Sequence, residues 1–134
     1  MIWDVLDYVD IFLPNDSEAF SITKSADSIE ALKKIGSKVN TVVIKCGARG
    51  AVGIANNEIV NVKAFKIKPV DTTGAGDSFD AGFIYYFVHK ERDFEESLRF
   101  ANAVGALACL YIGGAEGKIT EEEVLKFMRE FNSF

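Results

Sequence analysis

Apolar residues along the chain form two patterns, one of which predicts strands. Four apolar runs have the length of a strand: residues 8–14, 41–47, 51–55 and 58–65. The run at 41–47 is rich in β-branched residues, which predicts a buried strand. Asn56 and Asn57 separate the last two runs and predict a hairpin turn. We therefore expect these runs to be the strands of a β-sheet.

The second pattern has the period of an α-helix. Five segments carry it: residues 15–23, residues 28–38, the segment from the glycines near 75 to about 89, residues 93–114 and the segment from 120 onward. Asn15 and Glu18 stand three residues apart at the first of these starts, which is the spacing of a capping box. The fourth helix should end at Gly113 and Gly114.

The order of these elements indicates the fold class. One strand, two helices, three strands and three helices follow each other without a linker, a repeat or a low-complexity segment. This order predicts a layered α/β domain with a mixed sheet. We expect residues 1–134 to form a single domain.

Composition and charge narrow the class of partner. The chain is 49% hydrophobic and 26% charged, and its 15 basic and 20 acidic residues give a net charge of −5. Because no cluster of Lys and Arg occurs, nucleic acid and anionic membranes are not expected partners. We expect neither a secretory signal nor a transmembrane helix. Cys46 and Cys109 stand far apart in apolar segments, so we expect reduced thiols and a cytoplasmic location.

The most informative stretch is VDTTGAGDSFDAGF at residues 70–83. A strand end that passes through Gly74-Ala75-Gly76 into a helix would direct several backbone N–H groups at one point, which favours an anion such as phosphate. A bare G-x-G more often only eases a tight turn. The Walker pattern is absent, and a dinucleotide-binding loop would want a small residue in place of Phe79.

Asp77 directly follows these glycines. A carboxylate in the first turn of a helix is favoured by the helix dipole, and this alone could explain it. An acid beside an anion site also suits phosphoryl transfer, in which it accepts the proton of the attacking hydroxyl. The spacing does not decide between these two interpretations.

The same stretch closely resembles the C-terminal signature of the ribokinase-like, or PfkB, family of carbohydrate kinases. The matching residues are Asp71, Gly74, Ala75, Gly76, Asp77, Phe79, Ala81, Gly82 and Phe83. Three further segments are similar to the family's elements in the same order: residues 9–19, 42–51 and 99–114. The resemblance implies the C-terminal portion of the three-layer ribokinase-like α/β fold, with a mixed and mostly parallel sheet flanked by helices.

The resemblance also implies roles for single residues. Asp77 would be the general base that activates a substrate hydroxyl, and Gly74, Ala75 and Gly76 would form the anion hole for the transferred phosphoryl group. The remaining implied positions fall into three sets: Lys45, Gly47, Gly50 and Asn102 lining the nucleotide, Asn15 and Glu18 placing Mg²⁺ through water, and Asp71 and Thr73 binding a monovalent cation such as K⁺. The implied cofactors are ATP and Mg²⁺, and the implied partner is a sugar-like small molecule.

This chain departs from the family in length, because it corresponds only to the C-terminal half. Most residues that would grip the sugar belong to the other half, so we expect little or no kinase activity from this chain alone. An exposed sheet edge would favour a homo-oligomer. A non-catalytic nucleotide-binding or interaction fragment that retains the fold is the alternative.

Overall fold

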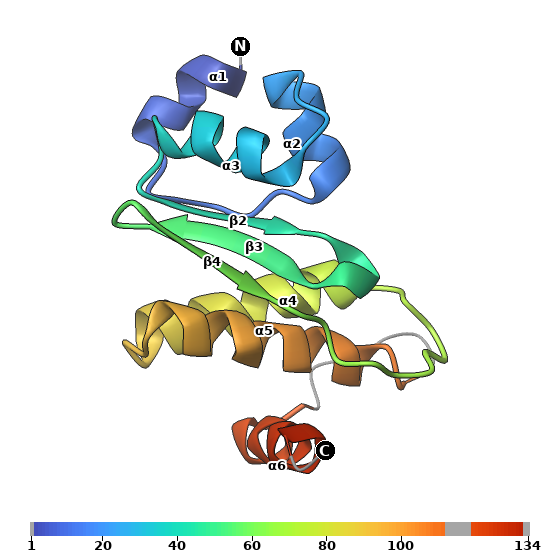
Figure 1. The fold of residues 1–134 in the computed structure, drawn as a ribbon. Helices are drawn as coiled ribbons and strands as arrows, with labels where there is room; N and C mark the ends of the chain where they lie inside the picture. Colours follow the sequence, from blue (N-terminus) through green and yellow to red (C-terminus); the bar gives the residue numbers. More distant parts are fainter. Residues whose placement is uncertain (1, 112–118, 133–134) are drawn as a thin grey trace. The chain divides into compact units, whose positions relative to one another are not determined.

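The computed structural model describes residues 2–111 and 119–132, which form two compact units (Figure 1). The first unit ends at Val62 and the second begins at Lys63. The first unit contains, in order, α1 (Ile2–Val5), the 3₁₀ helix η1 (Leu6–Tyr8), β1 (Ile11–Phe12), α2 (Asp16–Thr23), α3 (Ser28–Gly36), β2 (Thr41–Lys45), the 3₁₀ helix η2 (Gly47–Arg49), β3 (Ala51–Ala55) and β4 (Glu58–Val62). Figure 1 shows α2 and α3 on one face of the sheet.

The sheet is mixed, as predicted, with the strand order β1-β2-β3-β4. β1 pairs with β2 in parallel, and Ile11 lies opposite Thr41. The other two pairings are antiparallel, so the expectation of a mostly parallel sheet is wrong for the described strands. The reason is that only short loops join β2 to β3 and β3 to β4, whereas a parallel pairing needs a long crossover. The predicted hairpin is confirmed, with Asn56 (φ 51°) and Asn57 (φ 64°) in left-handed conformations.

The beginning of the chain differs from the prediction. The expected strand at residues 8–14 is reduced to Ile11–Phe12, and two short helices precede it. Leu6 is only 1% exposed and belongs to the core of this unit, with Trp3 and Val9 packed against it. Trp3, Leu6 and Val9 stand three residues apart, a spacing that suits a helical turn and that lies mostly before the predicted strand.

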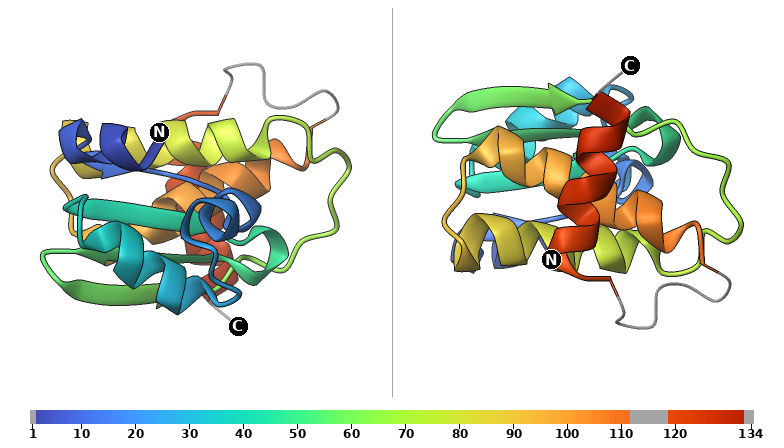
Figure 2. Two further views of the ribbon diagram at one scale, coloured as in Figure 1. Left: turned by 90° about the horizontal axis from the view of Figure 1, so that it is seen from above. Right: turned by 90° about the horizontal axis from the view of Figure 1, so that it is seen from below.

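The second unit is helical and contains α4 (Ala75–Phe83), the π-helical segment η3 (Ile84–His89), α5 (Phe94–Ala108) and α6 (Glu121–Asn132). Both views of Figure 2 show α4 and α5 side by side. Their close approach depends on glycine, because a Cβ on Gly82 would lie 2.8 Å from Cγ2 of Val104. The helix predicted up to about His89 is confirmed in extent, although its last part is π-helical.

The end of α5 differs from the prediction, and the start of α6 carries a side-chain cap. α5 ends at Ala108, earlier than predicted, and Gly113 and Gly114 lie outside the described residues. At the start of α6, the Oγ1 of Thr120 accepts a hydrogen bond from the N–H of Glu123 at 3.1 Å, as a capping box requires. The Glu123 carboxylate accepts a hydrogen bond from the hydroxyl of Tyr111, also at 3.1 Å.

An aromatic cluster fixes α6 within the second unit. The ring of Phe65 packs edge-on against Phe127 and Phe131, with centroid distances of 5.2 and 5.5 Å. Phe65 was predicted to belong to β4, which ends at Val62 because the following residues turn to this cluster. No helix in the described ranges is long and apolar enough to cross a bilayer.

Candidate functional site

A glycine turn leads into α4 and has the backbone geometry of an anion site. Gly74, at φ 75°, adopts the left-handed conformation that glycine tolerates without steric strain. The N–H of Ala75 donates to the carbonyl of Thr72 at 3.2 Å. The N–H groups of Gly76 and Asp77 find no acceptor within the described residues. Two neighbouring N–H groups at the positive end of a nine-residue helix can therefore bind an anion.

Asp77 is the third residue of α4, and its side chain is exposed. Gly74 has no side chain with which to cap this helix, so the carboxylate in the first turn supplies the only negative charge there. The same exposed carboxylate is placed within one helical turn of the two unpaired N–H groups. The geometry is thus compatible with both interpretations of Asp77, a favourable helix start and a general base.

Asp71 and Thr73 lie together just before the turn. The Oδ1 of Asp71 accepts a hydrogen bond from the N–H of Thr73 at 2.8 Å. The Asp71 carboxylate therefore has a structural role within its own loop, besides the cation binding predicted for it. That predicted monovalent cation site stays a prediction.

The two residues predicted to place Mg²⁺ form a complete capping box at the start of α2. The Oδ1 of Asn15 accepts from the N–H of Glu18 at 2.8 Å, and Oε1 of Glu18 accepts from the N–H of Asn15 at 2.9 Å. Both residues are exposed. Capping is confirmed, and it leaves Oε2 of Glu18 with access to a hydrated cation, because this second oxygen takes no part in the capping box.

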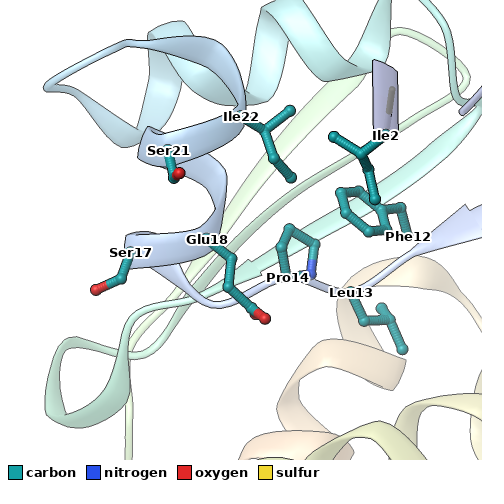
Figure 3. Close-up of a pocket in the computed structure, with 8 residues that line it drawn as sticks. All are labelled: Ile2, Phe12, Leu13, Pro14, Ser17, Glu18, Ser21 and Ile22. Carbon is teal, nitrogen blue, oxygen red and sulfur yellow. The ribbon is translucent and has the colours of Figure 1, made fainter. Parts of the chain in front are cut away.

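Glu18 also borders a cavity of about 500 Å³ in the first unit. Its lining combines an apolar part with Ser17, Glu18 and Ser21 of α2 (Figure 3). The apolar residues come from α1, from β1 and the two residues after it, and from α2: Ile2, Phe12, Leu13, Pro14 and Ile22. Figure 3 shows the Glu18 carboxylate beside Pro14, at the end of the lining where α2 begins.

The predicted nucleotide loop follows β2 in the same unit. Its two glycines have positive φ angles, 57° at Gly47 and 100° at Gly50, which other residues adopt only with strain. The loop is closed by a hydrogen bond from the N–H of Cys46 to the carbonyl of Gly50 at 2.8 Å. Lys45, the last residue of β2, forms a parallel bridge with Asn15. The predicted nucleotide loop and the predicted Mg²⁺ residues are therefore neighbours.

An ion pair that the sequence did not suggest ties this loop to α2. The guanidinium of Arg49 lies 3.0 Å from a carboxylate oxygen of Asp16. The Arg49 side chain is 73% exposed, so this pair contributes little to stability.

Asn102 belongs to the second unit, whereas the other predicted nucleotide residues belong to the first. It belongs to α5, it is 9% exposed, and its side-chain amide donates to the carbonyl of Lys63 at 3.2 Å. This bond holds the segment that follows β4. A contact between Asn102 and a nucleotide stays a prediction.

The site residues thus fall into two groups. The first unit brings together Asn15, Glu18, Lys45, Gly47 and Gly50, and the second brings together Asp71, Thr73, Gly74, Ala75, Gly76 and Asp77. Among the described residues, no three His, Cys, Asp or Glu side chains are grouped so that they could hold a metal ion.

Both cysteines are free thiols with raised pKa values. Burial raises the pKa of Cys46. Burial and, to a smaller extent, the negative charge of Asp71 raise the pKa of Cys109. A raised pKa lowers the thiolate fraction near neutral pH, which makes a thiol a weaker nucleophile.

Comparison with known families gives one match over most of the chain. The profile of the family described as "pfkB family carbohydrate kinase" matches residues 1–121. A ribokinase of Haemophilus influenzae is 31% identical over 131 residues, which cover 93% of this chain and 42% of the ribokinase. The chain therefore spans less than half the length of this curated relative.

Solved structures give the same fold. A candidate ribokinase II of Escherichia coli in complex with ATP and Mg²⁺ matches with a TM-score of 0.87 and 30% identity, covering 96% of this chain and 42% of that one. A ribokinase of Arabidopsis thaliana complexed with ribose and ATP matches with a TM-score of 0.85 and 30% identity, covering 95% and 43%. The predicted ribokinase-like α/β fold, an open mixed sheet flanked by helices, is confirmed.

Proposed function

We propose a function for this chain, which belongs to the pfkB family of carbohydrate kinases. It is the nucleotide-binding portion of an enzyme that phosphorylates a sugar hydroxyl with ATP. One observation carries this proposal. An exposed carboxylate, Asp77, follows a glycine turn that leaves two adjacent N–H groups without acceptors. Phosphoryl transfer needs both parts, because negative charge on the moving group must be stabilised while the attacking hydroxyl loses its proton.

In the proposed reaction, the Asp77 carboxylate accepts the proton of a substrate hydroxyl. The hydroxyl oxygen then forms a bond to the terminal phosphorus of ATP, the bond from that phosphorus to the bridging oxygen breaks, and ADP leaves with the bond's electron pair. The N–H groups of Gly76 and Asp77 donate to the oxygens of the moving phosphoryl group. The N–H of Ala75 already donates to Thr72, so we assign it a smaller part in the anion hole than Gly76.

The first unit supplies the second group of proposed contacts. Asn15 and Glu18 would hold a hydrated Mg²⁺, which supplies positive charge to the phosphates, and the Gly47–Gly50 loop beside Lys45 would receive the nucleotide. We propose Asn102 as a further contact from the second unit, and K⁺ at Asp71 and Thr73. A cytoplasmic location and self-association through a sheet edge stay predictions; β1 is an edge strand of the sheet that the described residues form.

The substrate is a sugar or a related small molecule. The ribose bound to the Arabidopsis relative is one example of this class. Because the chain spans only 42% of its ribokinase relative, we propose that it has little activity alone. The same fact favours the alternative, a non-catalytic nucleotide-binding or interaction fragment.

Stabilisation of the fold by MgATP tests this proposal. A ligand present at about a hundred times its Kd should raise the free energy of unfolding by about 2.7 kcal/mol. Gly76→Leu, at the second residue of α4, should abolish the effect by placing a bulky side chain beside the two N–H groups. Glu122→Leu is a matched control, because Glu122 is the exposed second residue of α6. Absence of stabilisation in the unsubstituted chain would favour the interaction fragment that binds no nucleotide, and equal stabilisation in all three proteins would exclude the turn as the phosphate site.

A further inference from the structure

The segment before the glycine turn is attached to the carboxyl end of α5. α5 ends at Ala108, so the carbonyl groups of its last turn have no partner within the helix. The carbonyl oxygen of Cys109, the C-cap residue, accepts two hydrogen bonds from outside the helix. They come from the N–H of Val70 at 2.8 Å and from the N–H of Asp71 at 3.0 Å.

Asp71 continues this connection toward the turn. Its backbone N–H is bound to α5, and its carboxylate accepts the N–H of Thr73, which immediately precedes Gly74. Inside the turn, the carbonyl of Thr72 accepts the N–H of Ala75. These hydrogen bonds, together with the peptide bond between Thr72 and Thr73, therefore connect the end of α5 to Ala75, the residue before the unpaired N–H groups of Gly76 and Asp77.

We infer that Asp71 is a positioning residue, which holds the glycine turn in register with the end of α5 so that its free N–H groups point at one anion. This inference rests on the proposed function for its purpose, but the hydrogen bonds that carry it do not. An anion site of this kind depends on donors that are already in place before the ligand binds. The backbone hydrogen bond from Asp71 to Cys109 and the side-chain hydrogen bond from Thr73 to Asp71 together hold these donors in place.

The same residue could instead serve chiefly as a cation ligand, and the two roles require different chemistry. Positioning needs a hydrogen-bond acceptor at Oδ1, which the carboxamide of an asparagine also provides. Cation binding needs the negative charge, which asparagine lacks. Asp71→Asn and Asp71→Ala therefore separate the two roles.

Hydrogen exchange of the chain without ligand is the first measurement. Asp71→Ala should accelerate exchange of the Thr73 and Ala75 amides by about tenfold, the effect of losing one hydrogen bond to a charged acceptor. Asp71→Asn should keep both amides close to their original rates. A second pair tests the anchor on α5: Val70→Pro removes the N–H that donates to Cys109, and Val70→Ala retains it. The Val70 side chain is 60% exposed, so its truncation should have little effect of its own.

The affinities for MgATP and MgADP, measured in KCl and in NaCl, are the second measurement. We expect Asp71→Ala and Val70→Pro to lower the preference for ATP over ADP by about fivefold, the effect of weakening one hydrogen bond to the terminal phosphate. Asp71→Asn and Val70→Ala should retain this preference. If the unsubstituted chain binds neither nucleotide, the proposed function fails and the exchange rates alone decide the role of Asp71. Equal acceleration of exchange in Asp71→Asn and Asp71→Ala, or no acceleration in Asp71→Ala, would overturn the positioning role.

Discussion

The capping box at the start of α2 allows a quantitative test of how this chain is held together. Asn15→Ala removes the acceptor of the Glu18 N–H at 2.8 Å and weakens the reciprocal bond from the Asn15 N–H at 2.9 Å. Replacing a capping Asn by Ala costs about 1 kcal/mol. Both partners are exposed, so water can satisfy the groups that remain and no desolvation penalty is added. For a chain of 134 residues this loss lowers Tm by about 3 to 5 °C.

The assay is urea unfolding at constant ionic strength, with thermal unfolding as a second probe. Asn15→Asp is the control, because Asp caps a helix about as well as Asn and should restore nearly all of the stability. Two results would refute the reasoning. One is a change below about 0.3 kcal/mol in Asn15→Ala, and the other is an equal loss in Asn15→Asp and Asn15→Ala.

Two further predictions concern pH and turnover. The pKa values of Cys46 and Cys109 are raised, so the folded chain holds the thiol protons more tightly than the unfolded chain does. The contribution of these thiols to the free energy of unfolding is therefore fully present below a pH of about 8.5, the pKa of a free thiol. It falls as the pH rises from there toward the folded pKa values. Urea midpoints of the chain and of the double Cys→Ala variant, compared between about pH 7.5 and pH 10, should show a smaller fall in the variant, and parallel curves would contradict this. A coupled assay of ADP release with a panel of sugars should detect almost no turnover from the 134-residue chain, because it spans only 42% of its ribokinase relative and orientation of the hydroxyl supplies much of the catalysis. Turnover at ordinary kinase rates, about 1–100 s⁻¹, would overturn that expectation.

Local signals in the sequence were sufficient for the elements that depend on neighbouring residues. The hairpin at Asn56 and Asn57 follows from the tolerance of Asn for positive φ angles, and the capping box follows from the spacing of Asn15 and Glu18. The glycine turn was predictable for the same reason, because only glycine tolerates the conformation of Gly74 at no steric cost.

The remaining features depend on contacts between residues far apart in sequence. The apolar run of α5 continues past Ala108, so periodicity alone predicted an end of the helix that is too late. For the same reason, the sequence did not indicate that the Cys109 carbonyl accepts hydrogen bonds from Val70 and Asp71. Backbone acceptors carry no side-chain signal at all. The pairing of Arg49 with Asp16 likewise depends on the return of β2 beside the start of α2, which the pattern of neither segment contains.

The central claim is that the N–H groups of Gly76 and Asp77 bind the terminal phosphate of ATP. The most direct measurement is a titration of the isotope-labelled chain with MgATP and, separately, with MgADP, followed through the NMR shifts of the backbone amides. We expect the Gly76 and Asp77 amides to shift with MgATP and to shift much less with MgADP, which lacks the terminal phosphate. Binding of MgATP that leaves both amides unchanged, or equal shifts with the two nucleotides, would contradict it.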